Sequence, residues 1–347
     1  MKPFRKNLAI AIDGGGIKGV VVTTALTMLE AHLGYPLHTR IGLTAGTSTG
    51  SIIAAGLASR MEAKTLNQLY LDLGDQIFRQ GISTRLWPFF NHRYSQVPLK
   101  KSLEKYFSDK NVADLWNATP PIDIVITTFD IVENRTRFIK PYKSKYAEWK
   151  LVDAVLASAA APTYFPSVDG SFIDGGVGSY NNPCYLAAYE IAFSLNWKLE
   201  ETTLISIGTG RDPNDIKRGE PDRFLPIQYI NPLLNAFGYS ATDQQVDLVK
   251  KLFPKLDFRR FQIDYKAVIP MDSPAKIPEL TRYGEQLGQL ILNDNVDRAM
   301  NVIPDRIPQM GSAIGHAFLK KSTTQGKTNK VRKHRVLTSH KQSARKH

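Results

Sequence analysis

Short apolar runs near the start of the chain alternate with stretches of helical spacing. Residues 8–12 form an apolar run of strand length, and between Val20 and Leu33 the apolar side chains recur at helical intervals. Residues 41–45 repeat the strand pattern, and a helical pattern then continues to about Ser59. A glycine-rich turn joins strand to helix in both cases. This region therefore predicts two successive strand–turn–helix units.

The same alternation continues through the rest of the chain. Further strands are expected at residues 122–129, 135–139, 204–207 and 259–263, and helices at 62–80, 98–108, 150–159, 183–195 and 276–292. Strands that alternate with helices favour a mostly parallel sheet covered on both faces, because each parallel connection crosses over a face of the sheet. We therefore predict a three-layer α/β/α fold. Residues 211–226 contain several prolines and glycines among charged residues, and we expect a long surface loop or lid-like insertion there.

Charge divides the chain into a nearly balanced body and a basic tail. The formal net charge is +13, but residues 320–347 hold ten Lys or Arg and no acid, which leaves 35 bases against 32 acids, or +3, in the remainder. The tail has too few large apolar residues to offset the entropy of ordering it. We therefore expect one domain over residues 1–319 and a disordered tail over 320–347, which favours an anionic membrane surface or, less readily, nucleic acid as a partner.

Cysteine usage and hydropathy indicate a cytoplasmic protein. Cys184 is the single cysteine of the 347 residues, so no internal disulfide can form. The apolar run at 8–12 is too short for a secretory signal, and the weakly polar runs at 51–58 and 155–161 fall short of the roughly 20 residues that a membrane-spanning helix needs. We expect contact with lipid to be peripheral.

The first glycine-rich turn, Asp13-Gly14-Gly15-Gly16-Ile17-Lys18-Gly19, is called the glycine loop below. Glycines let the backbone approach a ligand closely, and free N–H groups at the start of a helix can bind a phosphate or a developing oxyanion. The glycine spacing also fits a dinucleotide-binding fingerprint. However, the acidic residue expected roughly 20 positions later is missing, which disfavours nucleotide binding.

The second turn, Gly46-Thr47-Ser48-Thr49-Gly50, has the G-x-S-x-G pattern of a nucleophile elbow. It follows an expected strand and opens an expected helix, which is the context that this motif requires. In a parallel sheet both turns lie at the carboxyl ends of strands, where such sheets place their sites. A serine that merely caps the helix is the alternative interpretation.

A nucleophilic serine needs a base, and the chain offers two kinds. His316 is the one histidine of the body that comes late enough for a Ser, acid, His order, and no motif surrounds it. Asp174 ends a short strand-like run and is followed by Gly175 and Gly176, again a tight turn after a strand. Asp174 is the better-placed candidate, and a plain Asp-Gly-Gly turn is its alternative.

The glycine loop, the Gly46–Gly50 turn, the run Ala159-Ala-Ala-Pro-Thr-Tyr-Phe-Pro166 and Asp174-Gly175-Gly176 together resemble the patatin-like phospholipases. The resemblance covers residues 8–210. It implies that Ser48 is the nucleophile and that Asp174 is the general base of a Ser-Asp dyad. It further implies that Gly14, Gly15 and Gly16 form the oxyanion hole. The remaining motif positions have supporting roles: Asp13, Lys18, Gly19, Gly46, Gly50, Gly175 and Gly176.

The resemblance implies a lipid acyl hydrolase of phospholipase A or lysophospholipase type that needs no metal and no organic cofactor. Lys18 takes the family's basic position, where it would hold the glycine loop or a lipid phosphate. The aromatic run at 86–90 is either a lipid-contacting loop or a buried cluster. Two alternatives stay open: an esterase or acyltransferase that uses His316, and a non-catalytic nucleotide- or nucleic-acid-binding protein.

Overall fold

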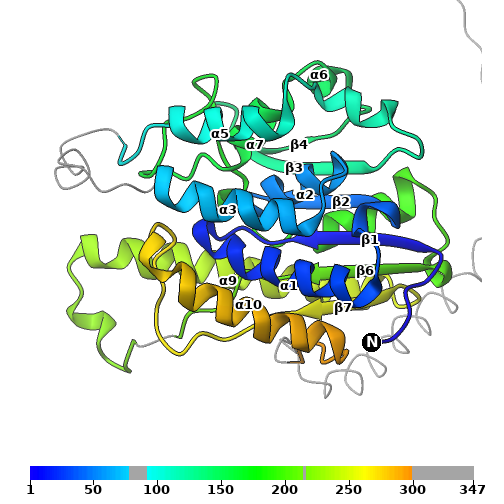
Figure 1. The fold of residues 1–347 in the computed structure, drawn as a ribbon. Coiled ribbons are helices and arrows are strands. Elements are labelled where there is room, and N and C mark those ends of the chain that lie inside the picture. Colours follow the sequence, from blue (N-terminus) through cyan, green and yellow to red (C-terminus); the bar gives the residue numbers. More distant parts are fainter. Residues whose placement is uncertain (78–91, 214–215, 299–347) are drawn as a thin grey trace, which may run out of the picture. The chain divides into compact units, whose positions relative to one another are not determined.

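The computed structural model describes residues 1–77, 92–213 and 216–298 (Figure 1). Seven strands in these residues form one sheet with the order β4-β3-β2-β1-β6-β7, and β5 pairs with β3. The strands are β1 (Asn7–Ile12), β2 (Ile41–Thr47), β3 (Asp123–Asp130), β4 (Arg135–Ile139), β5 (Phe172–Asp174), β6 (Thr202–Ile207) and β7 (Asp257–Phe261). Every strand expected from the sequence is present.

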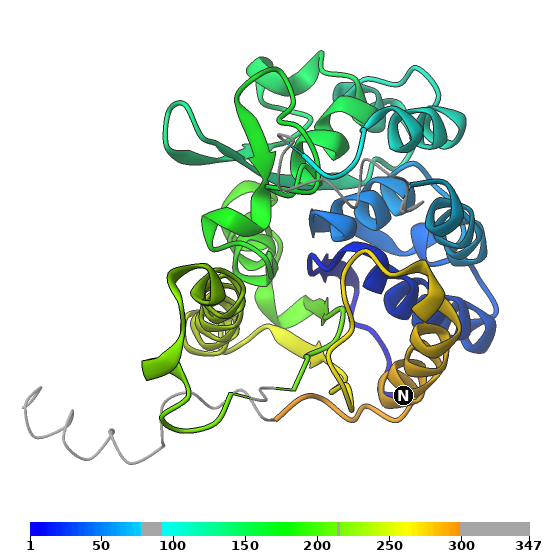
Figure 2. The same ribbon diagram turned by 90° about the vertical axis from the view of Figure 1, so that its left-hand side faces the viewer.

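Five adjacent strands of the sheet are parallel. β1 lies between β2 and β6, and the outer neighbours β3 and β7 keep the same direction. Only β4 and β5 run antiparallel to their partner β3. The carboxyl ends of the five parallel strands therefore meet at one edge of the sheet, which faces the viewer in Figure 2.

Both faces of the sheet are buried, and this explains why the central strands are apolar throughout. Alternate residues point to opposite faces, so Leu8, Ile10 and Ile12 of β1 enter one core while Ala9 and Ala11 enter the other. One face is covered by α1 (Gly19–Leu33), α2 (Thr49–Ala58), α3 (Ala63–Ile77), α5 (Val97–Phe107), α7 (Leu151–Ser158) and α10 (Ile277–Leu292). The opposite face is covered by α8 (Cys184–Tyr189) and α9 (Ile230–Leu252). The predicted three-layer α/β/α fold is confirmed.

The sequence patterns did not predict α9. Its first turns carry Pro232 and Asn235, and Gly238 follows, all residues with weak helix propensity. Its later part packs against the sheet through Val246 and Val249. The weak helix formers near its start explain why helix propensity did not indicate this helix.

The stretch expected as a surface loop, 211–226, is largely irregular where the structure describes it. It contains one 3-10 turn at Pro221–Arg223, and another, Pro226–Tyr229, begins at its end. The expected division between a domain and a tail at residue 320 lies outside the described residues.

Candidate active site

Ser48 occupies a strained turn between β2 and α2. Its backbone has φ 53° and ψ −124°, a region that non-glycine residues adopt at a cost of roughly 1–3 kcal/mol and that is typical of functional turns. The turn is tight enough to exclude side chains two positions before and two positions after the serine. A Cβ at Gly46 would lie 2.2 Å from the carbonyl oxygen of Gly50, and one at Gly50 would lie 2.2 Å from that of Ile12. The two glycines are thus a steric requirement of the elbow.

Strand register brings Asp174 to Ser48. Thr47, the last residue of β2, pairs with Thr127 of β3, whereas Asp174 of β5 pairs with the next residue, Thr128. β2 thus ends at Thr47, and beyond that point β5 pairs with β3 on the same side. Ser48 follows Thr47 directly, and its hydroxyl lies close enough to the Asp174 carboxylate to lower the pKa of that group.

Asp174 is only 7% exposed, and burial is the largest influence on the pKa of its carboxyl. Burial raises its pKa from the ordinary 3.8 to about 6, because a charged carboxylate is poorly solvated there. The Ser48 hydroxyl and the Gly176 N–H, which donates to Oδ1 at 2.8 Å, oppose this rise. A carboxyl with such a pKa is ionised at neutral pH and still basic enough to accept a proton.

The glycine loop lies against Ser48. A Cβ on Gly14 would be 3.1 Å from the Ser48 Cβ and 2.5 Å from Asn181 Oδ1, so a side chain there would crowd Ser48 and require Asn181 to move. The Gly14 N–H donates to the Asn181 carbonyl at 3.0 Å. In the described part of the chain, the N–H groups of Gly15 and Gly16 have no acceptor. They are consequently the two donors of the predicted oxyanion hole that are free to bind a ligand.

An ion pair that the sequence did not reveal anchors the start of the glycine loop. The Arg260 guanidinium, from β7, donates to both carboxylate oxygens of Asp13 at 2.7 and 2.5 Å and to the Ser206 hydroxyl at 2.8 Å. Both charged side chains are buried. Asp13 thus supports the loop from behind and does not face Ser48.

Lys18 anchors the other end of the loop. Its Nζ lies 2.6 Å from Asp212 Oδ2, and the lysine side chain is buried. Burial lowers the pKa of the Lys18 ammonium, and the ion pair with Asp212 opposes that effect. Asp212 also accepts the Ile269 N–H at 3.0 Å. Of the two roles left open for Lys18, this geometry favours holding the loop over contact with a lipid phosphate.

Two further side chains and one carbonyl contact the site, and the sequence motifs did not identify them. Ser158 Oγ accepts the Ser48 N–H at 2.9 Å, Thr209 Oγ1 donates to the Gly14 carbonyl at 2.6 Å, and the Met271 carbonyl accepts the Ile17 N–H at 2.9 Å. Ser158 directly precedes the motif run Ala159–Pro166, so its position beside that motif could have identified it. No motif surrounds Thr209 or Met271.

The alternative base lies beyond what the structure describes. His316, the aromatic run 86–90 and the basic tail 320–347 all lie outside the described residues. Within the described ranges, no histidine hydrogen-bonds to Ser48 or Asp174, and no group of three His, Cys, Asp or Glu could hold a metal ion.

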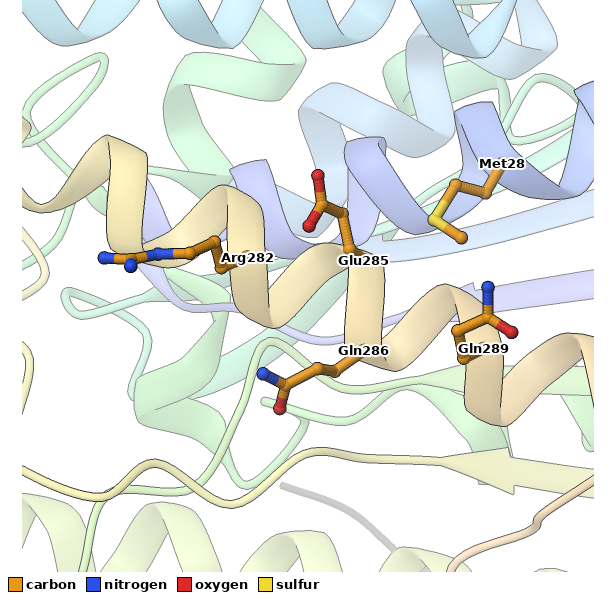
Figure 3. A pocket seen from close by; sticks show the side chains of 5 residues that line it. All are labelled: Met28, Arg282, Glu285, Gln286 and Gln289. Carbon is orange, nitrogen blue, oxygen red and sulfur yellow. The ribbon is translucent and has the colours of Figure 1, made fainter.

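An open depression of about 600 Å³ lies elsewhere, on the outer side of α1 and α10 (Figure 3). It is lined by Met28, Arg282, Glu285, Gln286 and Gln289. Met28 is nine residues after Gly19, which corresponds to about 14 Å along α1 from the glycine loop. The depression is therefore separate from the candidate active site.

Fold and elbow together define an α/β protein whose serine projects at the carboxyl edge of a parallel sheet. This chain belongs to the patatin-like phospholipase family, whose sequence model matches residues 10–188, just over half of the chain. The resemblance drawn from the motifs is thereby confirmed.

Among its relatives is a cGAMP-activated phospholipase of Pseudomonas aeruginosa, 31% identical over 210 residues, which are 58% of this chain and 61% of that protein. The chain is also 29% identical to Patatin-like protein 1 of Oryza sativa subsp. indica over 292 residues, or 70% of this chain and 69% of that one. The solved structure of VipD from Legionella pneumophila aligns with 93% of this chain and 77% of its own, with a TM-score of 0.44 and 11% identity. The match thus spans less than two thirds of the Pseudomonas protein.

In the portion that the structure describes, no helix is both long and apolar enough to cross a membrane.

Proposed function

We propose that this chain is a serine lipid acyl hydrolase of phospholipase A or lysophospholipase type. Ser48 is the nucleophile, Asp174 is the general base, and the N–H groups of Gly15 and Gly16 bind the oxyanion. The observation that carries this proposal is the register of β3, which sets a buried carboxyl of raised pKa beside the hydroxyl at the elbow. Family membership supports the substrate class.

The first half of the reaction transfers the acyl group to the enzyme. Ser48 Oγ attacks the ester carbonyl carbon as its proton passes to Asp174, and the carbonyl oxygen becomes an oxyanion. Donors held at such a position contribute about 3–4 kcal/mol each to lowering the barrier. When the tetrahedral intermediate collapses, the carbon–oxygen bond to the leaving alcohol breaks, and that alcohol takes the proton from Asp174.

The second half releases the fatty acid. Water attacks the acyl-Ser48 carbonyl and gives its proton to Asp174, and collapse of the second intermediate returns this proton to Ser48 Oγ. One carboxyl thus serves both halves, and its pKa of about 6 suits both tasks. The mechanism requires no histidine.

The test compares the parent chain with Ser48→Ala and Asp174→Asn on a panel of phospholipids and lysophospholipids, with released fatty acids identified by mass. We expect Ser48→Ala to fold, to lose covalent labelling by a fluorophosphonate and to lose nearly all ester hydrolysis. Asp174→Asn should abolish turnover as well. His316→Ala should retain most activity, and the reverse pattern would place the chain with the histidine-dependent esterases.

We also propose a cytoplasmic enzyme that meets its lipid at a membrane surface. The lone cysteine, buried Cys184, supports a reducing compartment. The ten basic residues of 320–347 support attraction to anionic lipid, at about 1 kcal/mol for each one held near the surface.

A further inference from the structure

Exposed aliphatic side chains gather on two turns at the active-site edge. Ile131 and Val132, in the turn between β3 and β4, are 55% and 73% exposed. Val268 and Met271, in the connection from β7 to α10, are 54% and 41% exposed. These four residues are called the aliphatic rim below.

The aliphatic rim flanks Ser48 on both sides. Ile131 directly follows β3, and its N–H donates to the Ser171 carbonyl at 3.0 Å, so it continues the pairing of β3 with the strand that carries Asp174. Met271 lies over the glycine loop that follows β1, since its carbonyl accepts the Ile17 N–H. β3 and β1 are the two neighbours of β2, each about 4.8 Å away. An apolar turn therefore stands beside Ser48 in either direction.

The rim also projects beyond the dyad. Ile131 is three residues past Thr128, the partner of Asp174, which is about 10 Å at the rise of a strand. Amphipathic helices at membrane surfaces bury their apolar face about 5–10 Å into the boundary between headgroups and acyl chains, and we expect a similar depth for the rim. A rim at that depth leaves Ser48 near the level of the headgroups and ester linkages. Glu133 and Arg135, both largely exposed beside Val132, can remain in the headgroup layer.

We infer that the aliphatic rim docks this enzyme on a phospholipid surface and directs Ser48 toward it. The inference rests on the proposed function, because the occupant is the surface that holds the substrate. Its carrying observation is that two turns, distant in the sequence, present bare aliphatic groups on opposite sides of one serine. The rim residues Val132 and Val268 are largely exposed and belong to neither the dyad nor the glycine loop, so we expect that both can be changed without altering the dyad.

The test measures partitioning of the full chain onto phosphatidylcholine vesicles by sedimentation, in a Ser48→Ala background so that no lipid is consumed. Val132→Asn and Val268→Asn each remove one rim side chain at constant charge. We expect each to weaken partitioning about fivefold, and the pair about 25-fold, from the apolar area no longer buried. Leu252→Asn is the control. Leu252 is 56% exposed at the end of α9, near the amino-terminal edge of the sheet, and its replacement should leave partitioning unchanged.

Activity measurements in the chain that retains Ser48 distinguish failure of the rim inference from failure of the proposed hydrolase function. The double variant should hydrolyse a soluble short-chain ester at the parent rate and vesicle phospholipid far more slowly. The inference would be overturned if the double variant bound vesicles as strongly as the parent. It would also be overturned if the parent chain did not bind vesicles. A change of oligomeric state in sedimentation velocity, with vesicle binding retained, would assign the rim to a second copy and overturn it too. If the parent hydrolyses neither substrate, the proposed function fails, while the binding measurement still decides the rim.

Discussion

Replacing Asp174 by asparagine should make this protein more stable at neutral pH while it abolishes catalysis. The carboxyl is 7% exposed, and its pKa is raised by burial from 3.8 to about 6. A difference of about 2 in pKa corresponds to about 3 kcal/mol of unfolding free energy. Asparagine has nearly the same shape, stays neutral and can still accept the Gly176 N–H.

The sign of the effect follows from which state holds the proton. Below about pH 4 the carboxyl is protonated in both the folded and the unfolded chain, so it has no effect. Between about pH 4 and pH 6 the unfolded chain has released the proton while the folded chain still binds it, so the free energy of unfolding falls as pH rises. Above about pH 6 the folded state carries the full cost of a buried carboxylate. Asp174→Asn removes this cost.

The assay is urea unfolding of the parent chain and of Asp174→Asn at intervals from pH 4 to pH 8. The gain in unfolding free energy should be near zero at pH 4 and reach up to about 3 kcal/mol at pH 8. Asp169→Asn is the control, because Asp169 is exposed in a turn and its loss removes one carboxylate away from the site. An Asp174→Asn variant that is no more stable than the parent at pH 8, or whose gain does not vary with pH, would refute the reasoning.

Three other measurements bear on the site. Single-turnover acylation from a soluble ester should rise with pH through an inflection near 6 and then level off, and a flat profile from pH 5 to 8 would exclude Asp174 as the base. Asp212→Asn should lower unfolding free energy by about 3–5 kcal/mol because it leaves Lys18 buried without its charge partner, and the double variant Lys18→Met, Asp212→Leu should recover much of that loss in urea titrations. Gly14→Ala should lose most esterase activity because the new Cβ meets Asn181, whereas Gly238→Ala in α9, where the space is open, should keep it and gain up to about 1 kcal/mol of stability.

The sequence predicted those parts of the site that depend on local geometry. The elbow needs Gly46 and Gly50 because a Cβ at either position would meet backbone atoms, and this requirement lies within five consecutive residues. The glycines of the glycine loop and of the Asp174 turn follow the same rule. Apolar alternation predicted the central strands because both faces of the sheet are buried. These features can be predicted because each depends on residues that are close together in the sequence.

The contacts that hold the glycine loop could not be predicted in this way. Asp13 and Arg260 are 247 residues apart, and nothing near either residue identifies the other. Their pairing depends on the order of strands in the sheet, where β6 separates β1 from β7. The interpretation of Lys18 stayed open for the same reason, since its partner Asp212 lies in an irregular segment. Helix α9 was missed because Pro232, Asn235 and Gly238 in its first half are weak helix formers.

The C-terminal third of the chain holds the glycine loop in place. The family match ends at residue 188, and by then both Ser48 and Asp174 have been supplied. The parts that fix the glycine loop come later: Thr209 binds its carbonyl, Arg260 binds its carboxylate, and Met271 accepts an N–H from it. The proposed nucleophile and base therefore lie within the family match, whereas the proposed oxyanion donors depend on contacts from residues that follow β6. Because oxyanion stabilisation is usually the largest single contribution to such catalysis, changes in that support should alter turnover without touching either member of the dyad.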